Sequence, residues 1–184
     1  MPEHEKRELS DLQDQETRLA LFSFNSSAVW ELGSTLRALA HKEYPEQSAY
    51  INITHANGTS LFLAHTADAI SPAYAAEADA IRNSVRRWEI SSWRRQRLLT
   101  LAERPSEYEK AESKATEFSL KGGGWPIRVK GVVGVVAVVV VTGLYPVNGG
   151  KGQGSFNPLK YDRPTDVNHE LIVKALDLTL DKQS

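Results

Sequence analysis

The run from Gly131 to Leu144, GVVGVVAVVVVTGL, limits the possible folds of this chain more than any other stretch. Its 14 residues are fewer than the roughly 18 to 20 that a helix needs to span a bilayer. Its valines are β-branched and occupy successive positions, a pattern typical of a strand that is covered on both faces. We therefore predict a buried strand within a layered domain and no membrane partner.

Glycines at the start of this region predict how the buried strand is paired. Residues 126–130 and 135–142 are expected to be two strands joined through Gly131 and Gly134, which permit a tight turn or bulge. A second hairpin is predicted at 49–55 and 60–65, because alternating runs flank Asn57-Gly58, a strong hairpin signal.

The remaining elements are predicted mainly as helices. Residues 18–24 read as a strand or the lead-in to one, and Thr165 is the expected cap of a final helix. The helical stretches are 3–17, 27–42, 72–104 with a break around Ser91-Ser92, 106–114, and the segment after Thr165. The order predicts an α+β fold, an antiparallel sheet of about five strands flanked by helices.

Length and composition exclude several classes of protein. At 184 residues the chain is expected to be one domain, with a Gly/Pro-rich loop at about 145–164. The absence of cysteine excludes a disulfide framework, a thiolate zinc site and a cysteine nucleophile. A formal charge of −1 gives no indication of a nucleic-acid partner, and the charged, polar N-terminus predicts a cytoplasmic protein.

The residues that are candidates for ligand binding lie at the edges of the valine-rich region. Gly122, Gly123 and the following glycine resemble a phosphate loop, but Trp125-Pro126 and a strand follow where a P-loop has a helix. Lys121 and Arg128 can anchor an anion, although a solvated basic face is the favoured explanation.

Histidine supplies the other candidate. His169 is placed in the first turn of the last helix, where it can act as a ligand or as a general acid or base, although a surface histidine is the more frequent case at such a position. The five histidines form no HxxxH or HxH pair, so we expect no metal site. The run RRWEISSWRRQR at 86–97 has the composition of a protein interface, and a solvated helix face is the alternative.

Several segments together resemble one known family. The pattern GGxxPIRVKGxVG followed by a hydrophobic strand, and NHELIVKALDL in the last helix, resemble the HbpS/GlcG-like, haem-degrading-domain family, in particular its uncharacterised bacterial and fungal branch. The segments AVWELGSTLRALA, INITHANGTSLF and RRWEISSW support the same resemblance. It implies an antiparallel sheet with packed helices, assembly into dimers or higher rings, and haem or another tetrapyrrole as a candidate ligand.

The chain departs from this family at positions where relatives carry polar residues. On the central helix relatives have an Asp-x-Asp-x-x-Trp segment and a basic pair, whereas here residues 73–84 retain only Arg82. The family's histidine before the double glycine is Lys121 here, and its histidine in the last helix is retained as His169. The scaffold is therefore expected to be kept and the functional surface to be altered.

Three functions follow as hypotheses. The leading one is an oligomeric small-molecule-binding protein for a carboxylate-bearing or tetrapyrrole ligand, with no cofactor required. Its pocket would lie near Lys121, Arg128 and His169, with Gly122, Gly123, Trp125 and Arg82 lining it. The second is a cofactor-independent isomerase, lyase or cyclase that uses His169 or Lys121 as its acid or base. The third is a non-catalytic assembly protein.

Overall fold

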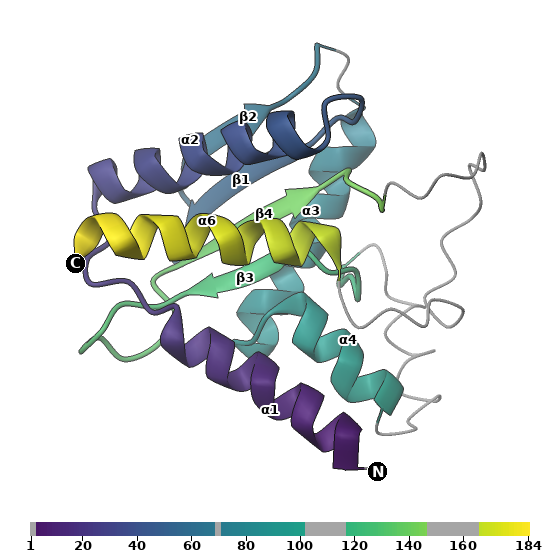
Figure 1. The fold of residues 1–184 in the computed structure, drawn as a ribbon. Helices are drawn as coiled ribbons and strands as arrows, with labels where there is room; N and C mark the ends of the chain where they lie inside the picture. The colour runs from purple at the N-terminus through teal and green to yellow at the C-terminus, as the bar shows by residue number, and fades with distance from the viewer. Residues whose placement is uncertain (1–2, 69–70, 102–116, 147–165) are drawn as a thin grey trace.

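The computed structural model describes residues 3–68, 71–101, 117–146 and 166–184, which form a single sheet with helices on both of its faces (Figure 1). The predicted α+β class with antiparallel pairing is confirmed. The described helices are α1 (Glu3–Arg18), α2 (Ser26–Glu43), α3 (Pro72–Trp88), α4 (Ser92–Leu101) and α6 (Val167–Gln183), and the strands are β1 (Tyr50–His55), β2 (Ser60–His65), β3 (Gly124–Ile127) and β4 (Ala137–Thr142).

Strand β4 is the centre of the sheet. The strand order is β2-β1-β4-β3, and β4 pairs antiparallel with β1 on one side and with β3 on the other. All six residues of β4 are buried, which confirms the prediction from its unbroken valines. Because its side chains alternate between the two faces, β4 contributes to the core on both sides of the sheet.

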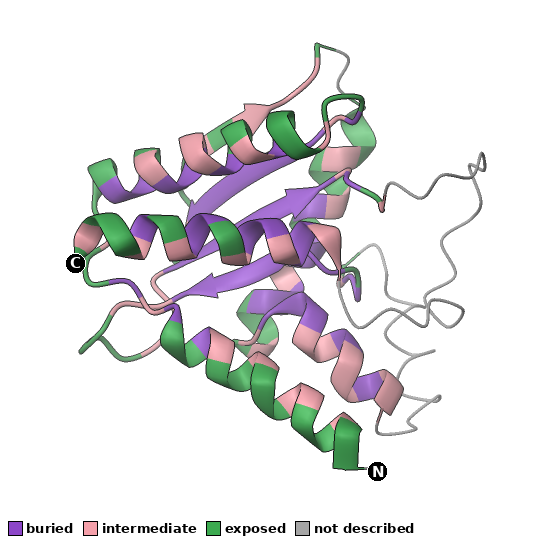
Figure 2. Cartoon of the chain, viewed as in Figure 1, coloured by how far each residue is buried: buried purple, intermediate pink, exposed green. Residues whose placement is uncertain are grey.

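The two faces of the sheet are covered by different helices. Helices α2 and α6 lie side by side on one face, and α3 lies on the other (Figures 1 and 2). Val139 and Val141 join the larger core cluster beneath α2 and α6, whereas Val138 and Val140 pack against Ile81 of α3. The second cluster does not include β2, so α3 leaves that edge of its face uncovered.

The strand count differs from the prediction of about five, because the described residues form four. Residues 18–24 contribute only a parallel bridge between Leu21 and Val129, formed by two backbone hydrogen bonds of 2.9 and 2.8 Å. The chain cannot extend this pairing, because Asn25 already caps α2. Leu21 therefore contributes a buried side chain to the core without adding a strand.

The predicted Asn57-Gly58 hairpin is confirmed as β1 and β2. Gly58 has a φ of 95°, and the Asn57 side chain accepts a hydrogen bond from the Thr59 backbone N–H at 3.0 Å. These are the conformation and side-chain bond that make Asn-Gly a favoured turn. The register shifts between Ile53 and Thr54, which marks a bulge close to the turn.

Helix boundaries agree with the sequence except at one cap. The predicted break near Ser91-Ser92 follows from Glu89, whose left-handed φ of 53° ends α3. The last helix is capped by Asp166, whose carboxylate accepts hydrogen bonds from two backbone N–H groups, and not by the predicted Thr165. A carboxylate is also favoured there by the helix dipole. Thr165, the predicted helix at 106–114 and most of the 145–164 loop lie outside the described residues.

The glycine-rich strand is shorter and earlier than predicted, at 124–127 in place of 126–130. Its entry depends on Gly123, which has a φ of 96° and whose carbonyl accepts a hydrogen bond from the Val141 N–H at 2.8 Å. A Cβ at Gly123 would lie 2.1 Å from the Val141 carbonyl oxygen. Any side chain at this position would therefore push β3 away from β4.

We expect Gly123→Ala to destabilise the fold by more than Gly131→Ala. Both glycines have positive φ, but a Cβ at Gly131 meets nothing within 4 Å. The left-handed backbone alone costs about 1–2 kcal/mol, so Gly131→Ala measures that cost and Gly123→Ala adds the clash. Chemical denaturation of both variants checks this, and equal losses of unfolding free energy would contradict the close approach.

Candidate functional site

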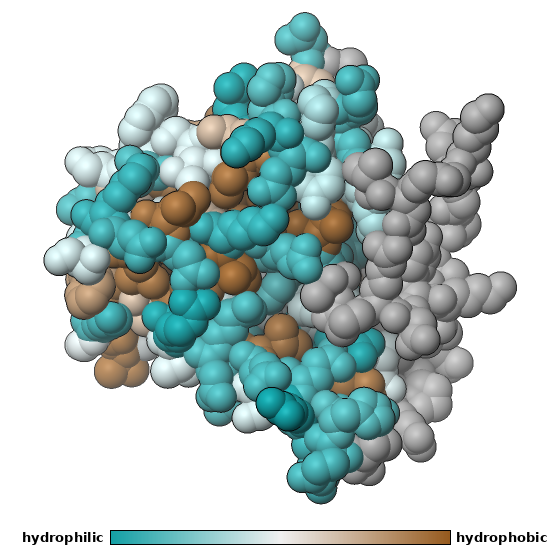
Figure 3. All heavy atoms as spheres, in the orientation of Figure 1, coloured by the Kyte–Doolittle hydropathy of each residue, from teal (hydrophilic) through white to brown (hydrophobic). Residues whose placement is uncertain are grey.

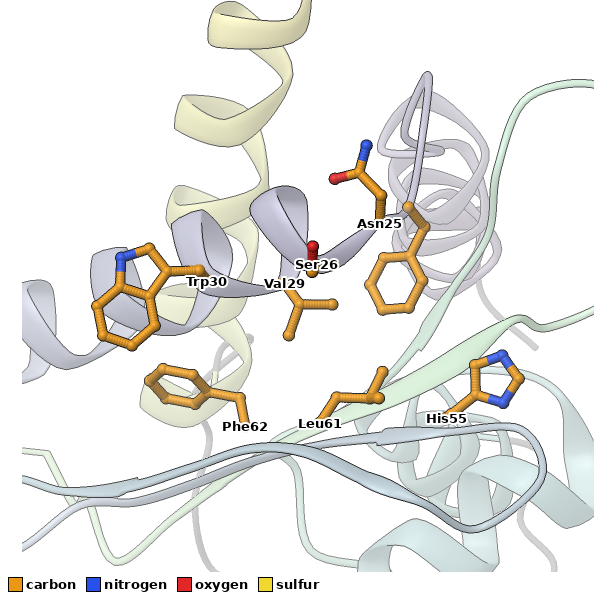
Figure 4. Close-up of a pocket in the computed structure, with 8 residues that line it drawn as sticks. Asn25, Ser26, Val29, Trp30, His55, Leu61 and Phe62 are labelled. Atoms are coloured by element: carbon orange, nitrogen blue, oxygen red, sulfur yellow. The ribbon is translucent and has the colours of Figure 1, made fainter.

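An open pocket lies between the start of α2 and the β1–β2 hairpin (Figure 4). Its volume is about 320 Å³, and its lining is mainly apolar. Figure 4 shows the Trp30 and Phe62 rings at one end of the pocket and His55 at the other. The lining residues are Phe24, Asn25, Ser26, Val29, Trp30, His55, Leu61 and Phe62.

Local sequence explains why aromatic rings gather here. The ring of Phe62 lies directly against Gly33 of α2, where a Cβ would be 2.5 Å from ring atoms. This glycine lets the helix approach the edge strand closely enough for Phe62 to contact Trp30 edge-on, with ring centroids 6.0 Å apart. Trp30 nevertheless remains 68% exposed, so a large aromatic surface is left facing the pocket and solvent.

The polar groups of the pocket are hydrogen-bond donors. His55 Nδ1 accepts a hydrogen bond from the Asn57 backbone N–H at 3.3 Å, which places the proton of the neutral ring on Nε2. Asn25 uses its Oδ1 to accept from the Ala28 N–H at 3.0 Å, leaving its amide NH₂ as the donor end. Figure 4 shows the Asn25 amide directed away from the hairpin, so the His55 Nε2–H is the donor that suits an acidic ligand group.

The sequence did not predict this pocket. Asn25 was expected to cap a helix, and Leu61 and Phe62 were expected to lie in a hairpin strand, which the structure confirms. Trp30 lies on the helix that was predicted at 27–42. The only local signal was Trp30, a large aromatic residue one position after the core residue Val29. The meeting of the two segments depends on the packing of α2 over the hairpin.

Lys121 lies at the opposite end of the sheet and is paired. Its ammonium donates to the Glu77 carboxylate, whose second oxygen accepts from the Thr142 hydroxyl. The Lys121 side chain remains 55% exposed. This group therefore joins α3 to the end of β4 through one carboxylate.

Gly122 and Gly123 bring the chain against the start of α6. A Cβ at Gly122 would lie 2.4 Å from Cγ of Asp166, and one at Gly123 would lie 2.8 Å from Cβ of Asn168. The Asp166 carboxylate accepts from the Asn168 and His169 backbone N–H groups, both at 3.0 Å. Burial raises the pKa of the Asp166 carboxyl, and these hydrogen bonds oppose that rise.

His169 is enclosed in the core. It is 4% exposed, its Nε2 lies 3.0 Å from the Gln15 side-chain oxygen, and its ring centroid lies 5.3 Å from that of Trp125. Burial lowers the pKa of His169 to about 3, so the ring is neutral at physiological pH. Among the described residues its Nδ1 has no hydrogen-bond partner.

The two predicted arginines lie apart from this group. Arg82 is on α3, where it contacts Asp79 at 2.5 Å and donates to Asn52 Oδ1 at 2.8 Å. Arg128 follows β3 and donates to the Glu89 backbone carbonyl at 2.7 Å. Lys121 contacts Glu77 and Arg128 contacts Glu89, which lie 12 positions apart along α3 and its cap, roughly 18 Å at the rise of a helix, so these two cations do not meet around one small acidic group.

The Arg/Trp-rich run makes contacts within the chain. Arg94 pairs with Glu16 at 3.0 Å, and Arg97 contacts Glu8 at 2.5 Å, which fixes α4 to α1. Arg95 lies over the Trp88 ring, 4.6 Å from its centroid. Arg94 and Arg97 of this run thus serve the packing of α4 against α1, whereas Arg86 donates to the Ala56 carbonyl at 2.9 Å.

The part of the chain that the structure describes has neither a metal-binding cluster nor a membrane-spanning helix. Over 3–68, 71–101, 117–146 and 166–184, no three histidine or acidic residues are placed to hold a metal ion. No helix in the same ranges is long and apolar enough to cross a bilayer.

Comparison with known proteins identifies the class of this domain. The family model for the haem degrading protein HbpS-like group matches residues 24–148. In overall fold the chain resembles the crystal structure of the Ybr137w protein, with a TM-score of 0.74, 20% identity, and coverage of 94% of this chain and 88% of that one. It also resembles PduOC in complex with haem, with a TM-score of 0.53, 13% identity, and coverage of 88% and 94%.

The chain belongs to the HbpS-like family. Within it, the chain is similar to the UPF0303 protein of Acidobacterium capsulatum, with 32% identity over 167 residues, 88% of this chain and 83% of the relative. The resemblance that the glycine-rich strand and the last helix suggested is therefore confirmed.

We expect His169 to make the fold sensitive to acid. The unfolded ring binds a proton near its ordinary pKa of 6.5 and the folded ring near 3, so between these values the unfolded state binds more protons. The contribution of the His169 ring to the unfolding free energy has its full value above about pH 6.5. Below that pH the unfolding free energy falls by up to about 1.4 kcal/mol per pH unit. His169→Gln removes this loss.

The measurement is unfolding free energy against pH for the wild type and His169→Gln. His41→Gln, at an exposed position of α2, is the control and should keep the wild-type slope. If His169→Gln also keeps that slope between pH 3 and 6.5, the ring is protonated in the folded state and the enclosed placement is wrong.

Proposed function

We propose that this protein binds a flat, largely apolar small molecule that carries a carboxylate, with tetrapyrroles as the ligand class. The observation that carries the proposal is the apolar pocket of about 320 Å³ at the start of α2, with the exposed Trp30 ring and the half-buried Phe62 ring at one end and His55 at the other. This volume lies at the small end of the about 300–1,000 Å³ found for small-molecule sites. The pocket can therefore hold part of a tetrapyrrole ring, and the exposed Trp30 side chain can cover the part that lies outside it.

The two ends of the pocket suit the two parts of such a ligand. Trp30 and Phe62 offer ring faces and edges for stacking, which adds to the gain from burying apolar area. The His55 Nε2–H supplies a donor for a carboxylate at the other end. No acidic residue lines the pocket to repel it.

In this pocket haem is better held by contacts to its ring and to one of its own carboxylate groups than by a bond from the protein to its iron. An axial ligand must present an unprotonated nitrogen, whereas the Asn57 N–H bond to His55 Nδ1 keeps the proton on Nε2. His55 is therefore assigned as a donor to a carboxylate. Bound haem would supply redox-active iron, but the proposed binding does not depend on it.

Family membership supports the ligand class, since the model is that of haem degrading HbpS-like proteins and PduOC is described as a haem complex. We also propose that the protein acts as a homo-oligomer and in the cytoplasm. Binding is favoured over acid–base turnover, because the pocket has no carboxylate to pair with His55.

Titration with hemin and with iron-free protoporphyrin IX tests this proposal, followed by Soret absorbance and tryptophan fluorescence. We expect both compounds to bind with similar affinity, because ring stacking and a carboxylate contact are common to them. Trp30→Ala should weaken both by about tenfold, equivalent to about 1.4 kcal/mol. The matched control is Tyr145→Ala, an exposed aromatic outside the pocket, which should bind like the wild type.

Three results would count against the proposal. If neither compound binds, the tetrapyrrole class is wrong. If hemin binds and the iron-free compound does not, the iron is ligated and the role of His55 as a donor fails. If Tyr145→Ala weakens binding as much as Trp30→Ala does, the ligand occupies a different surface.

A further inference from the structure

A bulge in the β1–β2 hairpin places two consecutive side chains in the pocket. Successive side chains of a strand normally point to opposite faces of the sheet, yet Leu61 and Phe62 both line the pocket. Ser60 and Phe62 pair with consecutive residues of β1, so Leu61 between them is the extra residue of the bulge. Because the extra residue interrupts the alternation, both side chains can lie on the α2 side of the sheet. The lining that β2 supplies therefore depends on the bulge.

A buried amide on the other face of the sheet holds this bulge in place. Asn52 is 3% exposed, and its Nδ2 donates to the Ser60 hydroxyl and to the Phe62 carbonyl, both at 3.0 Å. These two acceptors lie on either side of the extra residue. Asn52 Oδ1 accepts from Arg82 of α3 at 2.8 Å, so the amide is itself fixed. The backbone that carries the Phe62 ring is thus held from the face opposite the pocket.

The Phe62 ring fills the space that Gly33 leaves on α2. Gly33 is buried, and a Cβ there would lie 2.5 Å from atoms of the ring. With Trp30 edge-on against it, the Phe62 ring forms one end of the pocket, and His55 lies at the other end (Figure 4). Figure 4 also shows the Trp30 indole nitrogen on the side away from Phe62. The end of the pocket at Phe62 is therefore apolar.

A cationic side chain lies beyond this ring. Arg37 follows Gly33 by one helical turn, is exposed, and donates from its Nε to the His65 carbonyl of β2 at 3.0 Å. Along both α2 and β2, the contact between Phe62 and Gly33 comes between the rest of the pocket and this Arg37 bond. In the space-filling view, the side of the molecule that α2 and α6 cover is mainly hydrophilic, with apolar groups in patches (Figure 3). The Phe62 ring thus separates an apolar pocket end from a polar surface.

We propose that Phe62 is the specificity-determining residue of this pocket, which takes flat acids whose carboxylates lie along one edge and whose opposite edge is apolar. This role of Phe62 rests on the proposed function, because it concerns the ligand of the same pocket. The acidic edge meets the His55 Nε2–H, and the apolar edge meets Phe62 and Trp30. A further carboxylate on the opposite edge would lose its water against two aromatic rings, which is costly. Protoporphyrin IX, with both carboxylates on one edge, belongs to this class, and a linear diacid does not.

Gly33 is a positioning residue in the same arrangement. It is not among the residues that line the pocket. Any side chain at this position would displace the Phe62 ring from its place between α2 and β2. Gly33 therefore acts on the ligand through Phe62.

Fluorescence titration with two probes tests the specificity. The probes are a pyrene monocarboxylate and a pyrene dicarboxylate whose two carboxylates lie at opposite ends of the ring. We expect the wild type to bind the monocarboxylate about tenfold more tightly, because only the dicarboxylate places a charge against Phe62. In Phe62→Ala this end opens toward solvent and Arg37, so the preference should fall to about twofold or less. Leu63→Ala, at the next position of β2 but outside the pocket, is the matched control and should keep the wild-type preference.

A double-mutant cycle without ligand tests the contact between Phe62 and Gly33. Gly33→Ala should lower the midpoint of chemical denaturation in the wild type, because the new methyl group meets the ring. In a Phe62→Ala background the same substitution should raise the midpoint, because alanine is a better helix former than glycine. Gly33→Ala should also weaken binding of the monocarboxylate by the wild type and have no further effect in the Phe62→Ala background.

Several outcomes would contradict these roles. A wild type that binds the two probes equally, or binds neither, removes the specificity, and so does a Phe62→Ala variant that keeps the wild-type preference. If Gly33→Ala lowers the midpoint equally in both backgrounds, Gly33 does not position the ring. Hemin separates these failures from failure of the proposed function. If hemin binds and the preference between the pyrene probes is absent, only the role of Phe62 is wrong; if the preference is present and hemin does not bind, the tetrapyrrole class is wrong and the role of Phe62 stands.

Discussion

The double burial of β4 is the constraint on which the rest of the structure depends. A strand that is buried at every position and contains four successive valines must be paired on both edges and covered on both faces, since an uncovered face would expose valines. Pairing with β1 and β3 satisfies the edges. Helices α2 and α6 on one face and α3 on the other supply the cover.

The outer strands and the ends of the sheet do not have to be paired and covered on every side, so binding sites are expected there. At one end, close packing of Gly122 and Gly123 against α6 leaves little space, and Lys121 and His169 are engaged by Glu77 and Gln15. At the other end, the start of α2 stands apart from the hairpin and an open pocket remains. The same tight core therefore produces one filled end and one open end.

Most of the fold could be predicted because its signals are local. Asn57-Gly58 specifies its turn through a left-handed glycine, and Asn25 caps α2 through one side-chain bond. The candidate site could not be predicted in this way. Lys121 and Arg128 are close in sequence, but an extended strand carries them to opposite ends of the sheet, and the valines on each side of Gly134 gave no sign that some are buried and others fully exposed.

The sequence by itself determined the family, the antiparallel hairpins and the position of the buried central strand, since these depend on turn residues and on an unbroken apolar run. The tertiary structure alone decided which polar residues meet, which valines are buried, and where a pocket opens. The physical reason is that a pocket forms where two elements fail to close on each other. Here the closeness of α2 to β2 is set by Phe62 against Gly33, 29 positions apart.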